Sequence, residues 1–169
     1  MKEFLLKIGS KLRTFHTEKF SKYQTKEIDE LILSHLGLSD LGKLRDKFEG
    51  ESFRINKTKM ILSYLSVCSY LKIKPISLLK IDLDNFKPEV EYKNQKFRII
   101  CSDFGSFPAL EKDLKLPFIY VVCRSVLDYK IIGYSSENLL KNPKSYQIDN
   151  LNRKIFKSIE MLNNFSDEK

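Results

Sequence analysis

The stretch KTKMILSYLSVCSYLK, residues 57–72, decides the fold of this 169-residue chain. Its apolar side chains occupy most sides of a helical wheel, which is typical of a helix buried at the centre of a core. A later run, PFIYVVCR at residues 117–124, is rich in β-branched and aromatic residues and predicts a strand. The sequence therefore predicts a protein that combines helices with strands.

The residues before this central helix read as further helices joined by short polar connections. Thr25 is a favourable N-cap for a helix that Gly37 ends, and Asn56 is a favourable N-cap for the central helix. A short helix after Gly37 is expected to end at Gly50. The expected helices span residues 2–15, 25–36, 41–49 and 57–72, with a polar connector at residues 17–24 and a short helical turn at residues 75–79.

After residue 82 the pattern changes to that of strands. The segment EVEYKNQKFRIIC, residues 89–101, predicts a hairpin that turns at Asn94. The segment YKIIGY, residues 129–134, predicts another strand, in which Gly133 is expected to mark a bulge or a sharp exit. Short helices are expected beyond it.

These elements predict an α+β fold. The N-terminal half, residues 1–80, is expected to be a basic helical region. Residues 81–169 are expected to form a small, mostly antiparallel β-sheet with flanking helices at residues 135–142 and 149–164. The two regions are expected either as separate units or as one compact domain.

The net charge of +8 is concentrated in the first half of the sequence. Residues 1–80 hold 16 Lys and Arg against 9 Asp and Glu, whereas residues 81–169 hold 14 against 13. A basic region attracts polyanions, so the first expected function is a small, non-enzymatic, regulatory protein that binds nucleic acid through its helical half. The expected phosphate contacts are Lys7, Lys11, Arg13, Lys19, Lys22, Lys43, Arg45, Lys57 and Lys59. The alternative is that these lysines only solubilise the surface.

A second expected function is a partner-binding, assembly or regulatory protein that acts through protein–protein contacts. Aromatic side chains dominate such interfaces, and the loop at residues 102–116 is long enough to act as a contact segment. The aromatic anchors expected to be exposed are Tyr23, Tyr70, Phe104, Phe107, Tyr120, Tyr129 and Tyr134. The sequence leaves open the partner and the oligomeric state.

A third expected function is a Mg²⁺-dependent nuclease. Glu91-Tyr92-Lys93 forms an E-x-K pattern in which strand alternation would place Glu91 and Lys93 on one face. With Asp84 upstream, the two carboxylates would hold Mg²⁺ and the lysine would stabilise developing charge. The pattern resembles the D…E-x-K motif of restriction-endonuclease-like nucleases. The alternative is the solvated outer face of a hairpin.

Other chemistries are excluded by what the sequence lacks. Its three cysteines form no C-x-x-C pair, and its two histidines lie near no cysteine or serine motif, so a structural zinc site and a catalytic triad are not expected. Its six glycines form no phosphate-binding loop. No metal or cofactor is expected. Cysteines in apolar surroundings suit a reducing compartment, so a cytoplasmic protein without a transmembrane segment is expected.

The segment from residue 89 to 150 resembles the C-terminal region of an uncharacterised family of cyanobacterial proteins. The similar elements are NQKFRII, LPFIYVVCRSV and IIGYSSENLLKNPKSYQID, in which Gly133-Tyr134 is followed by a polar pair and a leucine. The resemblance implies a cyanobacterial or plastid-related cytosolic protein. It transfers no catalytic residue.

Overall fold

The computed structural model describes residues 16–135, except residues 46, 48 and 105–115. The helices expected at residues 2–15, 135–142 and 149–164 therefore lie outside the described part, apart from Ser135, which ends a strand. In the part that is described, no helix is long and apolar enough to cross a membrane.

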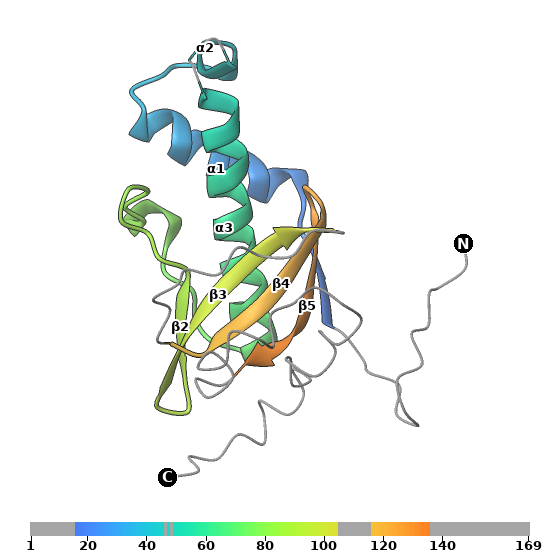
Figure 1. The fold of residues 1–169 in the computed structure, drawn as a ribbon. Coiled ribbons are helices and arrows are strands. Elements are labelled where there is room, and N and C mark those ends of the chain that lie inside the picture. Colours follow the sequence, from blue (N-terminus) through green and yellow to red (C-terminus); the bar gives the residue numbers. More distant parts are fainter. Residues whose placement is uncertain (1–15, 46, 48, 105–115, 136–169) are drawn as a thin grey trace, which may run out of the picture.

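A five-stranded sheet forms one layer of the fold, with the strand order β1-β5-β4-β3-β2 (Figure 1). Neighbouring strands are antiparallel except β3 and β4, which run parallel. The strands are β1 (His16–Lys19), β2 (Glu89–Tyr92), β3 (Gln95–Asp103), β4 (Phe118–Ser125) and β5 (Asp128–Ser135). The predicted α+β class with a mostly antiparallel sheet is confirmed.

The central helix is α3 (Gly50–Leu71), and it packs behind the sheet in the view of Figure 1. It contacts all five strands, whereas α1 (Lys22–His35) packs on α3. Ile61, Leu62 and Val67 of α3 are fully buried in one hydrophobic core. That core also contains residues of α1, β2, β3, β4 and β5, so it joins residues from both halves of the sequence. The predicted burial of this helix is confirmed.

Local hydrogen bonds fix where α1 begins and ends. Ser21, and not Thr25 as expected, is the N-cap: its side chain accepts from the Gln24 backbone, and the Gln24 side chain accepts from the Ser21 backbone. At the other end Gly37 adopts a φ of 64°, and the amide of Leu38 donates to the carbonyl of Leu33 at 2.9 Å. This Schellman geometry confirms Gly37 as the stop.

The start of α3 differs from the prediction. The helix begins at Gly50, well before Asn56, and Gly50 does not end the short helix α2 (Leu41–Arg45). A Cβ on Gly50 would lie 2.1 Å from the carbonyl oxygen of Leu44. The glycine therefore allows α2 to approach the first turn of α3 closely. The early start extends α3 by seven residues, about two turns, on the side of the candidate site.

The segment at residues 17–24, expected to be a connector, contains all but the first residue of strand β1. Its four residues, HTEK, pair with β5 from His16 opposite Ile131 to Lys19 opposite Asp128. An edge strand needs only backbone pairing on one side, so polar side chains form it without an apolar pattern.

The predicted hairpin of β2 and β3 is confirmed. Lys93 and Asn94 form its two-residue turn, and both have positive φ, 49° and 62°. Two such residues in succession are typical of a type I′ turn. The irregularity expected at Gly133 is also present: Tyr120 pairs with Gly133 and Val121 with Ile131, which leaves one residue of β5 extra.

Candidate functional site

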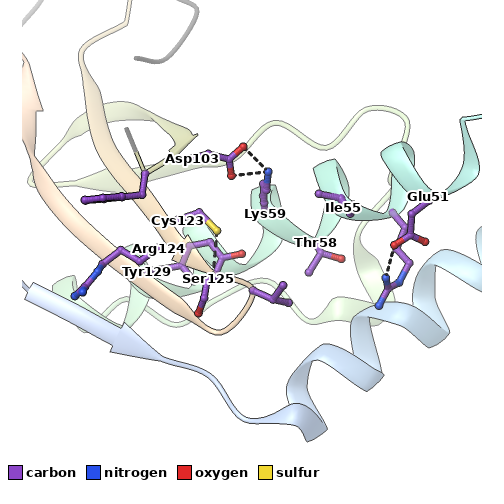
Figure 2. A pocket seen from close by; sticks show the side chains of 12 residues that line it. Glu51, Ile55, Thr58, Lys59, Asp103, Cys123, Arg124, Ser125 and Tyr129 are labelled. Carbon is purple, nitrogen blue, oxygen red and sulfur yellow. Dashed lines mark hydrogen bonds and ion pairs between the residues drawn. The ribbon is translucent and has the colours of Figure 1, made fainter. Parts of the chain in front are cut away.

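A pocket of about 620 Å³ lies between the first half of α3 and the ends of β3, β4 and β5 (Figure 2). This volume lies in the range of ligand-binding clefts. The helix lines it with Glu51, Arg54, Ile55, Thr58 and Lys59, and the sheet side with Asp103, Phe104, Cys123, Arg124, Ser125, Val126 and Tyr129. The helical residues recur at three- and four-residue spacing, so they share one face of α3.

The opening of the pocket carries three large apolar side chains that remain exposed. Phe104 is 76% exposed, Val126 is 63% exposed and Ile55 is 41% exposed. They come from three different segments: the end of β3, the turn between β4 and β5, and α3. An apolar rim around one cavity is typical of an interaction site, whereas single exposed apolar residues are ordinary.

Ion pairs hold the charged wall of the pocket in place. Lys59 of α3 contacts the Asp103 carboxylate of β3 at 2.6 Å. Arg54 contacts Asp29 of α1 at 2.7 Å and Glu51 at 2.9 Å. The hydrogen bonds that Arg54 donates to Asp29 raise the pKa of Arg54 against the opposing effect of burial. These pairs fix α3 to α1 and to the sheet.

Two buried hydroxyl groups line the same pocket without hydrogen bonds. Thr58 is 7% exposed and Tyr129 is fully buried, and neither side-chain oxygen forms a hydrogen bond of normal geometry. Burial, and next to it the neighbouring Cys123 thiol, raises the pKa of Tyr129, so its hydroxyl stays protonated and can donate. Most buried hydroxyls in proteins have a partner, so two without one in a single pocket point to a ligand.

The cysteine in the pocket is not set up as a nucleophile. Burial raises the pKa of Cys123, and its thiol donates to the carbonyl oxygen of Ser125 at 3.2 Å. Burial likewise raises the pKa of Cys101, to about 12. The thiolate is the reactive form, so both cysteines are held in the unreactive state.

Arg124 is the most accessible cation of the pocket. Its side chain is 50% exposed, and its contact with the Asp128 carboxylate is long, at 3.8 Å. Lys130 of β5 lies opposite Val122, two residues before Arg124 in β4. Burial, and next to it the charge of Arg124, lowers the pKa of Lys130. This corner of the sheet therefore brings two cations near one carboxylate.

The residues expected to bind nucleic acid are separated in the structure. Lys57 donates to the Leu83 carbonyl and Lys59 pairs with Asp103, so both make internal contacts. Lys19 and Lys22 lie where β1 meets α1, whereas Lys43 and Arg45 lie in α2, beyond the other end of α1. The 14 residues of α1, a helix about 21 Å long, separate these two pairs of basic residues. Lys7, Lys11 and Arg13 lie outside the described residues. Nucleic-acid binding stays a prediction.

The expected nuclease residues occupy three different settings. Glu91 is exposed in strand β2, opposite Lys96 of β3. Lys93 lies in the hairpin turn and not in β2, so the expectation that it shares a strand face with Glu91 is wrong; its ammonium lies 5.6 Å from the centre of the Tyr92 ring. Asp84 contacts the His35 ring at 3.2 Å. Among the described residues there is no group of three or more His, Cys, Asp or Glu that could hold a metal ion.

The expected exposed aromatics divide into two groups. Tyr23 is 69% exposed and Phe104 is exposed at the pocket, as predicted. The prediction is wrong for Tyr120, Tyr129 and Tyr134, which are buried. Tyr120 lies in β4, which is buried at six successive residues, and its hydroxyl lies 2.7 Å from that of Ser102. The Tyr134 ring packs edge-on against Phe97. Tyr70 is half-buried against His16, and Phe107 lies outside the described residues.

Comparisons of the chain with protein-family models, with curated proteins and with solved structures gave no match. The resemblance to a cyanobacterial family therefore stays a prediction. The candidate site rests on its own geometry.

Proposed function

We propose that this chain is a non-enzymatic binding protein that recognises a segment of a partner protein through the pocket between α3 and the sheet. The observation that supports the proposal is the rim of exposed apolar side chains around a cavity of about 620 Å³. Complete burial of one large apolar side chain stabilises a complex by about 1.5–3 kcal/mol. Covering Phe104, Val126 and Ile55 together therefore favours association.

Binding is favoured over catalysis by the chemistry of the pocket. None of the residues that line it is a histidine, and the Cys123 thiol is protonated and bonded to Ser125. The carboxylates of Glu51 and Asp103 are both engaged with cations of α3. A nucleophile needs a base within reach, and these side chains supply specific contacts instead.

The proposal is tested by capturing partners on the immobilised full-length chain. Val126→Asp places a charge at the rim in an exposed turn, and Leu79→Asp is the matched control, because Leu79 is 93% exposed and is not among the pocket residues. The wild type and Leu79→Asp are expected to retain the same protein in stoichiometric amount from an extract of the cells that make it, and Val126→Asp is expected to lose it. Equal capture by all three, or capture by none, contradicts the proposal.

A further inference from the structure

We infer that the partner segment seated in this pocket carries a carboxylate beside an apolar side chain. The inference rests on the proposed function and adds the chemistry of the partner.

The distribution of charge in the pocket favours an acidic partner segment. The pocket is lined by three cations, Arg54, Lys59 and Arg124, and by two carboxylates, Glu51 and Asp103. Glu51 lies 2.9 Å from Arg54, and Asp103 lies 2.6 Å from Lys59. Of the three cations, Arg124 has the longest carboxylate contact, 3.8 Å from Asp128. A planar guanidinium that is half exposed presents paired N–H groups, which match the two oxygens of a carboxylate.

The two buried hydroxyl groups of the pocket also favour a ligand that supplies oxygen atoms. Thr58 on α3 and Tyr129 on β5 line the pocket from opposite walls, and neither hydroxyl forms a hydrogen bond of normal geometry, since Tyr129 has only the Cys123 thiol beside it (Figure 2). A hydroxyl group both donates and accepts, but next to cations the favourable incoming group is an oxygen acceptor. The carboxylate and the backbone carbonyls of an extended segment supply such oxygens.

The apolar rim lies next to the charged residues of the pocket. Phe104 directly follows Asp103, and Val126 lies three residues before Tyr129. Ile55 lies one turn of helix before Lys59. Apolar and charged contacts therefore alternate around one opening. A segment with an apolar residue next to Asp or Glu satisfies both kinds of contact, whereas a basic segment places like charge on Arg124.

The experiment selects peptides from a displayed random library on the immobilised full-length chain. We expect the enriched peptides to share Asp or Glu next to a large apolar residue. Arg124→Gln is expected to weaken the binding of an enriched synthetic peptide by at least tenfold in fluorescence polarisation. Arg45→Gln is the matched control, because Arg45 is exposed on α2 and outside the pocket, and it is expected to leave the affinity unchanged.

The outcomes separate the two proposals. Enrichment of neutral or basic peptides, or an affinity that Arg124→Gln leaves intact, overturns the carboxylate inference and leaves the proposed function standing. The absence of any peptide whose binding depends on Val126 overturns both. Thr58→Val provides a second readout in a chain that remains folded: loss of one hydrogen bond is expected to weaken the same peptide by about fivefold, and an unchanged affinity contradicts a contact between Thr58 and the peptide.

Discussion

Replacing Thr58 by valine removes the buried hydroxyl while keeping the shape of the side chain. Thr58 is 7% exposed, and its hydroxyl oxygen has no partner in the structure. A buried polar group left without a hydrogen bond costs about 1–3 kcal/mol. Threonine and valine are both β-branched and have similar helix propensities, so α3 itself is little affected. The free energy of unfolding is therefore expected to rise by about 1 kcal/mol.

Thermal and urea unfolding measure this change. For a chain of this length, 1 kcal/mol corresponds to an increase in Tm of about 2–4 °C. The urea midpoint should rise while the slope stays constant, because the surface exposed on unfolding is unchanged.

Thr25→Val is the matched control, because it makes the same chemical change where the hydroxyl has a partner. The Thr25 hydroxyl donates to the carbonyl of Lys22 at 2.9 Å. Its loss is expected to lower stability by up to about 1 kcal/mol, the net worth of a typical hydrogen bond. The two variants therefore shift Tm in opposite directions. A Thr58→Val protein that is less stable than the wild type refutes the reasoning, since the hydroxyl would then be hydrogen-bonded and not directed at a ligand.

Three further predictions concern the fold and the remaining functional expectation. Gly50→Ala places a Cβ 2.1 Å from the Leu44 carbonyl oxygen, so urea unfolding should show a loss of about 2 kcal/mol; unchanged stability contradicts the close approach of α2 to α3. Burial, the largest single influence, would raise the pKa of Glu89, but the hydrogen bonds and charges of Lys96 and Arg98 together outweigh it and the pKa is lowered. The stabilising effect of Glu89 is therefore present above the ordinary Glu pKa and is lost as the pH falls through the lowered value. Glu89→Gln should therefore be less stable than the wild type at pH 7 and equal to it at about pH 2 in thermal melts, and a deficit independent of pH contradicts this. If the basic residues bind nucleic acid, Lys22→Gln should reduce the slope of log affinity against log salt concentration by about 1 in fluorescence anisotropy. An affinity that does not change with salt concentration rules this function out.

The elements that the sequence predicts correctly are those that one local pattern determines. Adjacent Lys93 and Asn94 suit the positive φ values of a tight turn, and Gly37 suits the left-handed end of α1. The central helix is recognisable because it is apolar on most sides, and its burial follows from that composition.

The errors arise where distant parts of the chain decide the structure. β1 forms because it pairs with β5, whereas the sequence HTEK shows no strand pattern of its own. The early start of α3 accompanies the close approach of Leu44 to Gly50, and helix propensity does not predict this contact.

The candidate pocket could be anticipated only in part. Phe104 was among the aromatics expected to be exposed, and it lies at the rim. The helical wall was missed because a helix that starts at Asn56 excludes Glu51, Arg54 and Ile55. The spacing of these three residues with Thr58 would have revealed a shared face had the helix been extended. The pocket residues of β4 and β5 could be identified only from the pairing of these strands in the sheet.

The central claim is that a partner protein occupies the pocket rim at Val126. Its most direct test is photocrosslinking in the cells that make the protein, with benzoylphenylalanine in place of Val126 or, as the control, in place of Leu79, which is 93% exposed outside the pocket. The account predicts one discrete crosslinked species at position 126 that is absent at position 79. No crosslink at position 126, or the same crosslink at both positions, contradicts it.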